Sequence, residues 1–130
     1  MIKTKAKFII FAIWGTLSLL TVGSLEAYGS QPKLAQVVYI TLTKACGCIL
    51  ERCQAGDIVV GNVFNGARQG LLKRIDYSTD KEAAKVYIKK YRVTQAPALL
   101  FLDAQGNLLW MRAGELKEPE IADKLFQFGG

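Results

Sequence analysis

Histidine is absent from the 130 residues of this chain. Its absence excludes a Ser-His-Asp triad, a Cys-His catalytic pair and any His-ligated metal site built from this chain alone. The sequence also lacks a stretch in which basic residues alternate with aromatic ones. The formal net charge is +6, which favours an anionic partner or membrane surface in general. Without such a stretch, nothing points to nucleic acid as a partner.

The first 29 residues have the pattern of a targeting segment. Three lysines within the first seven residues precede an uncharged, largely apolar run at residues 8–25. Export signals begin in this way, and residues 27–29 supply small side chains spaced for cleavage after Gly29. The run also reaches about 18 residues, the minimum for a membrane span. We therefore expect residues 1–29 to be a signal peptide or an uncleaved membrane anchor. Both alternatives place the rest of the chain outside the cytoplasm, in the periplasm or anchored facing outward.

The remaining sequence predicts a short linker at residues 30–36 and one domain at residues 37–130. Its elements follow the order β, α, β, α, β, β, α. The predicted strands are residues 37–43, 71–77, 98–102 and 108–113, and the predicted helices are residues 49–67, residues 79–91 and a last helix that opens at Pro119. Strands joined through helices imply parallel crossovers, and the last two strands form an antiparallel hairpin. We expect an α/β fold of three layers, with a mixed sheet of about four strands between helices. A hydrophobic N-terminal helix would be added to it.

Two helices carry local signals at their predicted ends. Gly56 is expected to kink or divide the first helix, and Asp57 could then cap its second part. Thr79 and Glu82 are spaced as a capping box, which predicts that Thr79 caps the second helix.

Two segments resemble the thioredoxin superfamily. In the first, a buried strand runs directly into Cys46 at the start of a helix. In the second, residues 91–114 show a helix end, the pattern V-x-x-x-P at Val93–Pro97, a strand, a glycine turn and a second strand. The resemblance covers nearly all of residues 34–128. In that family the proline is cis and lies beside redox cysteines. The resemblance therefore implies a cis Pro97, with the backbone of Ala96 available to pair with a substrate strand.

The cysteine motif departs from that family's pattern. The family usually shows C-x-x-C after an aromatic residue, whereas this chain reads Lys44-Ala45-Cys46-Gly47-Cys48. The second cysteine thus comes one residue early. In addition, Ile40 stands where many thioredoxins carry a buried carboxylate.

Cys46 and Cys48 are the candidate catalytic residues. A helix N-terminus favours the thiolate of Cys46, and Lys44 and Arg52 add positive charge nearby. We predict that Cys46 attacks and that Cys48 resolves. A disulfide between them would close a small strained ring, and strain makes such a bond a better oxidant.

Cys53 has three interpretations. A regular helix would separate it from Cys46 by about 10 Å, which is beyond the reach of a disulfide. It could be a buried core residue. It could be a third thiolate that binds a soft metal ion such as Cu(I), Zn(II) or Hg(II) together with Cys46 and Cys48. It could also resolve a mixed disulfide after local opening or with another chain.

These observations lead to one principal functional hypothesis and two alternatives. The principal hypothesis is a membrane-associated, extracytoplasmic thiol–disulfide oxidoreductase that needs no cofactor. Its partners would be protein thiols and disulfides, with a redox partner in the cell envelope. The alternatives are a soft-metal carrier or sensor, and a non-catalytic thioredoxin-like subunit of a membrane assembly.

Overall fold

The computed structural model describes residues 29–130, so the predicted N-terminal helix, signal peptide or anchor lies outside the described residues. The elements are β1 (Gln36–Thr41), α1 (Gly47–Val63), a 3-10 helix (Gly66–Leu71), β2 (Leu72–Asp76), α2 (Lys81–Tyr91), β3 (Ala98–Leu102), β4 (Leu108–Ala113) and α3 (Glu118–Phe128). Their order confirms the sequence-based prediction. Within residues 29–130, no helix is both long enough and apolar enough to cross a bilayer.

The four strands form one mixed sheet in the order β2-β1-β3-β4. β1 runs parallel to β2, and β3 and β4 form the predicted antiparallel hairpin. The expected second parallel crossover is wrong, because β3 runs antiparallel to β1. At the end of α2, the Tyr91 hydroxyl donates a hydrogen bond to the carbonyl of Gly106, in the turn at the far end of β3. Residues 92–97 then return to the near end of the sheet, where β3 begins.

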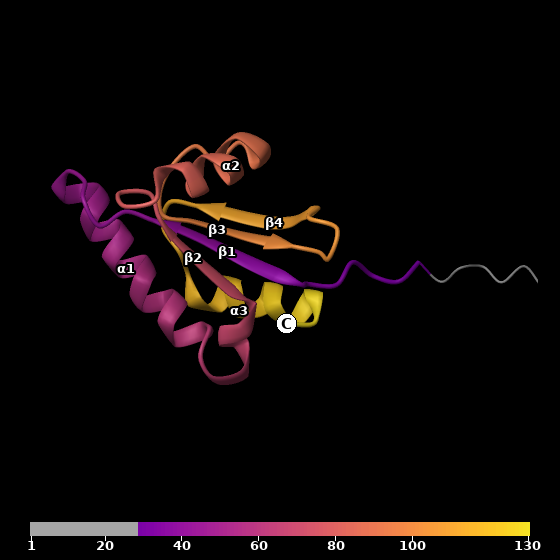
Figure 1. Cartoon of the computed structure of the whole chain (residues 1–130). Coiled ribbons are helices and arrows are strands. Elements are labelled where there is room, and N and C mark those ends of the chain that lie inside the picture. The colour runs from indigo at the N-terminus through magenta and orange to yellow at the C-terminus, as the bar shows by residue number, and fades with distance from the viewer. Residues whose placement is uncertain (1–28) are drawn as a thin grey trace, which may run out of the picture.

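Helices cover both faces of the sheet, as Figure 1 shows. Alternate residues of β1 point to opposite faces. Val37 and Tyr39 join the core beneath α1 and α3, whereas Val38 and Ile40 join the core beneath α2. The predicted three-layer α/β architecture is therefore confirmed.

Gly56 lies inside one continuous α1 helix and does not divide it. A Cβ atom at this position would lie 2.9 Å from Pro97 Cγ and 2.9 Å from the Tyr39 hydroxyl. The glycine therefore allows the helix to approach the sheet closely, and Asp57 caps no second helix. The predicted extension of the helix to residue 67 is also wrong, since α1 ends at Val63 and a 3-10 helix follows.

Asp80 is the N-cap of α2. Its carboxylate accepts a hydrogen bond from the backbone N–H of Ala83 at 3.2 Å. Thr79, the predicted cap, instead donates its hydroxyl to the Asp76 carbonyl at 3.4 Å. Asp80 caps the helix in place of Thr79 because a carboxylate at the N-cap is at least as good a hydrogen-bond acceptor as a hydroxyl.

Candidate functional site at the cysteine end of the sheet

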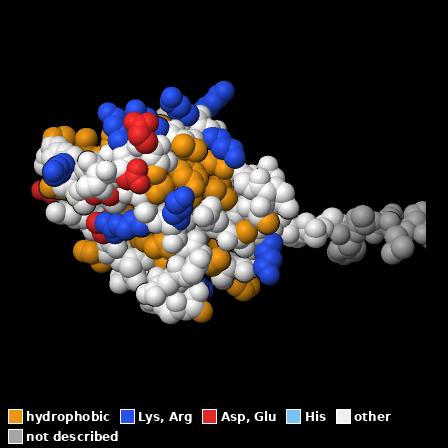
Figure 2. All heavy atoms as spheres, viewed as in Figure 1, with side chains coloured by type: hydrophobic (Ala, Val, Ile, Leu, Met, Phe, Trp, Pro, Cys, Tyr) orange, Lys and Arg blue, Asp and Glu red, His pale blue; other side chains and the backbone are white. Residues whose placement is uncertain are grey.

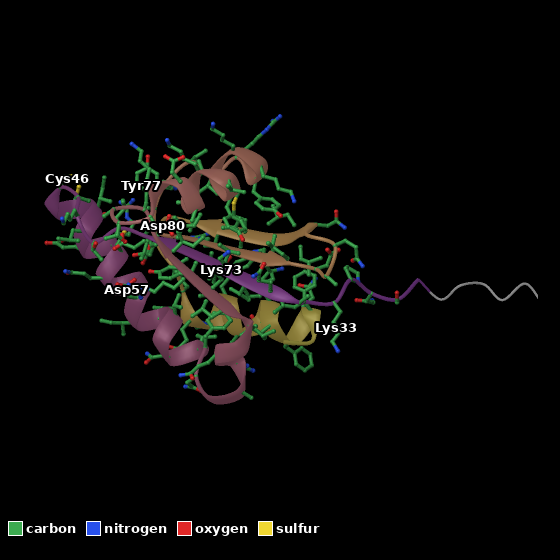
Figure 3. The ribbon with its side chains drawn as sticks, viewed as in Figure 1. Lys33, Cys46, Asp57, Lys73, Tyr77 and Asp80 are labelled. Carbon is green, nitrogen blue, oxygen red and sulfur yellow. The ribbon has the colours of Figure 1, made fainter. Side chains whose placement is uncertain are left out.

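Cys46 and Cys48 lie at the start of α1. Figure 3 shows Cys46 at one end of the molecule. Cys46 is the N-cap, and its carbonyl accepts hydrogen bonds from the N–H groups of Ile49 and Leu50 at 3.1 and 3.0 Å. This confirms the predicted place of Cys46 at a helix N-terminus. Both thiols are exposed and unbonded, with their Sγ atoms 3.9 Å apart. The two sulfurs are in direct contact, so a small movement would bring them to bonding distance.

Cys53 is separated from this pair by burial. Its side chain is 0% exposed, and its carbonyl accepts a hydrogen bond from the Tyr39 hydroxyl at 3.3 Å. The part of the chain that the structure describes contains no cluster of three or more His, Cys, Asp or Glu side chains placed to hold a metal ion. A metal site made of all three thiols would require Cys53 to leave the core.

Hydrogen bonds to Asp76 and Ser78 fix the loop that leads from β1 to Cys46. The Thr43 hydroxyl donates to Asp76 Oδ2 at 2.6 Å, and the Thr43 N–H donates to Asp76 Oδ1 at 3.3 Å. The N–H of Lys44 donates to Ser78 Oγ at 3.0 Å, and the Ser78 hydroxyl contacts the Lys44 carbonyl at 3.3 Å. The last residue of β2 and Ser78 just beyond it therefore hold the loop two residues before the first cysteine.

The negative charge of Asp76 contributes to these hydrogen bonds. Its partial burial would by itself raise the pKa of the carboxyl. The hydrogen bonds donated by Thr43 and by Ser78 outweigh that effect and hold the pKa below its ordinary value. Asp76 is thus ionised at neutral pH, in the state that accepts all of these bonds.

The Ala96–Pro97 peptide bond is cis, as the resemblance implied. Pro97 is buried, and its carbonyl accepts a hydrogen bond from the N–H of Gly114 at 2.8 Å. Gln95 donates its side-chain amide to the Ala113 carbonyl at 3.3 Å. Both bonds attach the segment before β3 to the end of β4, so this segment has a fixed place beside α1.

Two hollows lie on either side of the segment 93–96. A polar hollow of about 550 Å³ is bordered by Cys48, Arg52, Gln95 and the end of β4. The Arg52 guanidinium reaches Gln95 Oε1 at 3.5 Å and so bridges α1 to this segment. An apolar hollow of about 200 Å³ is bordered by Ile40, Leu42, Tyr77, Ile88 and residues 93–96. The second cysteine therefore faces polar surroundings, with an apolar recess across the segment.

A carboxylate of α1 bonds to β1 and β2 on the face of the sheet opposite Ile40. Ile40 is buried beneath α2, but Asp57 of α1 lies half-buried on the opposite face of the sheet. Its oxygens accept hydrogen bonds from Tyr39 at 2.7 Å, Thr41 at 3.1 Å and Arg74 at 2.9 Å. Burial raises the pKa of Tyr39 above its ordinary value, Asp57 adds to the rise, and Thr41 acts in the opposite direction. Tyr39 is therefore a permanent donor that joins α1 to the sheet.

Positive charge gathers over α2, at the top of the view in Figure 2. The helix carries Lys81, Lys85, Lys89 and Lys90 against a single acidic residue, Glu82. Lys81 lies over the ring of Tyr77, with its Nζ atom 5.6 Å from the ring centroid. This side of the molecule favours an anionic partner.

Sequence reasoning missed the roles of Asp57, Asp76, Ser78 and Gln95. The role of Asp76 had a usable signal. β1 and β2 are parallel neighbours in which Thr41 pairs with Asp76. The ends of such strands and the residues after them meet at the same edge of the sheet, so Asp76 and Ser78 had to lie beside the cysteine loop.

Comparison with known proteins adds a fold-level result. No protein-family model and no curated protein matches the sequence. The reduced C-terminal domain of DsbD from Neisseria meningitidis is similar with a TM-score of 0.54 and 14% identity, over 75% of this chain and 84% of that one. The chain has the thioredoxin fold. Oxidised thioredoxin O2 from Arabidopsis thaliana is similar with a TM-score of 0.51 and 18% identity, over 73% of this chain and 75% of that one. An uncharacterised thioredoxin-like protein from Clostridium perfringens is similar with a TM-score of 0.50 and 16% identity, over 77% and 75%.

Proposed function

We propose that this chain is an extracytoplasmic, membrane-associated protein that exchanges thiols and disulfides with protein partners through Cys46 and Cys48. The observation that carries the proposal is the pair of exposed thiols, 3.9 Å apart, at the start of α1 of a thioredoxin fold. Structural neighbours include the DsbD C-terminal domain in both its reduced and its oxidised form. The basic, apolar N-terminal segment supports the location.

The exchange proceeds by two displacements at sulfur. The Cys46 thiolate attacks one sulfur of a partner disulfide and forms a mixed disulfide, while the other partner sulfur leaves as a thiolate and takes up a proton. The Cys48 thiolate then attacks the Cys46 sulfur and releases the second partner thiol. Two electrons pass to the partner, and the chain is left with a Cys46–Cys48 disulfide. When the two displacements run in reverse, the Cys46–Cys48 disulfide oxidises a dithiol partner. Ring strain from the two-residue spacing favours this oxidising direction.

The segment before β3 supports the binding of an extended partner. Ala96 precedes β3 and borders the apolar hollow, while Gln95 borders both hollows. An extended partner segment that pairs with this backbone, as in β-augmentation, would place its side chains alternately toward the two hollows. Ala96 and Pro97 are therefore the proposed substrate-binding residues.

Single-cysteine substitutions in the full-length chain, kept in mild detergent, test the chemistry. The assays follow oxidation of a dithiol peptide by the oxidised protein and reduction of a disulfide-bonded peptide by the reduced protein. Cys46→Ser should abolish exchange, and Cys48→Ser should accumulate the mixed disulfide. Cys53→Ala is the matched control, because a buried thiol should contribute nothing to the rate. Exchange that survives the loss of Cys46 would refute the proposed mechanism.

Labelling of intact cells tests the location. A membrane-impermeant maleimide should modify the two exposed thiols, Cys46 and Cys48, without permeabilisation. Labelling that requires lysis of the cells would contradict the extracytoplasmic proposal.

A further inference from the structure

The last turn of α3 carries the most exposed large hydrophobic side chain of residues 29–130. Phe126 is 91% exposed, compared with 66% for Ile58 and 63% for Val86. It borders a shallow hollow of about 270 Å³ together with the linker residues 31–33 and with residues 127–129. We call the surface formed by residues 31–33 and 126–129 the α3 patch. An aromatic ring this exposed favours contact with a surface that removes it from water.

The α3 patch lies where the chain leaves the domain toward its N-terminal apolar run. The N–H of Leu34 donates to the Phe128 carbonyl at 3.0 Å, which fixes the end of the linker against α3. The apolar run ends at Leu25, so only residues 26–33 separate it from this fixed point. Eight residues span at most about 28 Å when fully extended. An anchored run would therefore hold this end of the domain close to the bilayer.

We infer that the α3 patch rests on the outer surface of the bilayer, with the ring of Phe126 at the level of the lipid headgroups. Phenylalanine on the exposed face of a helix that lies on a membrane is buried at the boundary between headgroups and acyl chains. Lys33 borders the hollow of the patch, and the Lys124 ammonium donates a hydrogen bond to Gln127 of the patch at 3.0 Å, so both place positive charge there for lipid phosphates. The nearby carboxylate of Asp103 is engaged within its own turn, where it accepts hydrogen bonds from Gln105 and Asn107. The inference rests on the membrane association in the proposed function, and it does not depend on the thiol chemistry.

This orientation directs the cysteines away from the membrane. β1 runs from the linker toward Cys46, and its six residues alone span about 20 Å. Lys33 and Cys46 accordingly lie at opposite ends of the molecule in Figure 3. A domain that stands on the α3 patch would meet its partners in their extramembranous portions, beyond the headgroup layer.

Tryptophan probes in the full-length chain test this orientation. Trp14 lies within the apolar run, so every protein carries Trp14→Phe, while Trp110 remains as a constant background. Phe126→Trp places the probe on the α3 patch. Val86→Trp is the matched control, because Val86 is an exposed apolar residue on α2, which covers the opposite face of the sheet. The proteins are reconstituted into vesicles of phosphatidylethanolamine and phosphatidylglycerol, with and without bromine-labelled acyl chains, and are then floated on a density gradient.

Flotation reports whether the protein associates with the membrane, and quenching reports which face of the domain meets the bilayer. The inference expects the protein to float with the vesicles and the brominated lipid to quench the Phe126→Trp probe several-fold more than the Val86→Trp probe. Flotation without quenching of Phe126→Trp would overturn the inference and leave membrane association intact. Equal quenching at both positions would also overturn it, because the domain would then have no preferred face. Absence of flotation would refute membrane association and the inference with it.

Discussion

The contact between α1 and the cis-proline segment depends on the missing side chain at Gly56. A Cβ atom there would lie 2.9 Å from Pro97 Cγ and 2.9 Å from the Tyr39 hydroxyl, both closer than real Cβ contacts. Neither neighbour can move freely. Pro97 is buried, and the Tyr39 hydroxyl bonds to Asp57 at 2.7 Å and to the Cys53 carbonyl at 3.3 Å. We therefore predict that Gly56→Ala destabilises the fold, although alanine is the better helix former.

Three contributions set the size of this effect. The gain in helix propensity on replacing glycine by alanine is about 1 kcal/mol. Overpacking of a well-filled core costs about 1–3 kcal/mol. Displacement of the Tyr39 hydroxyl from the Asp57 carboxylate would weaken a charged hydrogen bond worth about 1.5–3 kcal/mol. The unfavourable terms exceed the favourable one, and we expect a net loss of about 1.5–5 kcal/mol.

Urea denaturation of the full-length chain in non-ionic detergent measures this loss. Gly61→Ala is the matched control, because Gly61 lies in the same helix and a Cβ atom there would have no neighbour within 4 Å. This control should keep or raise stability, by up to about 1 kcal/mol. The reasoning fails if Gly56→Ala is as stable as the parent protein. It also fails if the two variants shift the unfolding midpoint in the same direction.

Three further substitutions test the supports of the site. Asp76→Asn should slow thiol exchange at pH 7 by loosening the loop that Thr43 joins. Folding lowers the pKa of Asp76, so the stability that its carboxylate contributes is present above about pH 4 and is lost at lower pH. In a pH series, the variant should therefore lose less stability on acidification than the parent protein. Tyr39→Phe should lower the free energy of unfolding by about 1.5–3 kcal/mol, since Asp57 loses a charged hydrogen bond; an unchanged urea midpoint would contradict this role. Gly114→Ala should cost about 1–3 kcal/mol because Gly114 has a φ of 94°, which alanine adopts only with strain; thermal unfolding at two scan rates would detect it.

The sequence was sufficient for the features that rest on periodicity. Short runs rich in apolar, β-branched and aromatic residues predicted the strands, and helical spacing predicted the α-helices, because these patterns reflect which parts of each element are buried. The direction of β3 was not predictable in this way. It depends on the return of residues 92–97 along α2 rather than on any hydrophobic pattern. Gly56 was misread for a related reason, since a glycine that breaks a helix and one that admits a neighbouring proline are identical in sequence.

The candidate site likewise has features that the sequence could predict and features that it could not. The place of Cys46 follows from local order, and the cis state of Pro97 followed from the family resemblance, through the pattern at Val93–Pro97. The residues that hold them come from distant positions. Asp76 and Ser78 reach the loop across 33 or more residues, and Gln95 meets Arg52 across 43. Side chains that act through tertiary contact leave no periodic signal, so only the register of parallel strands could have indicated them.

The shortened spacing of the cysteines changes the surroundings of the second thiol. The usual spacing would place that cysteine at position 49, where Ile49 is half-buried, whereas Cys48 is exposed. One residue along a helix is a rotation of about 100°. This rotation carries the second sulfur from the partly covered face toward the polar hollow beside Arg52. Both thiols are consequently open to partners, and a mixed disulfide on Cys46 can be attacked by Cys48 or by an external thiol. Such an arrangement suits the shuffling of disulfides between partners better than the protected storage of one.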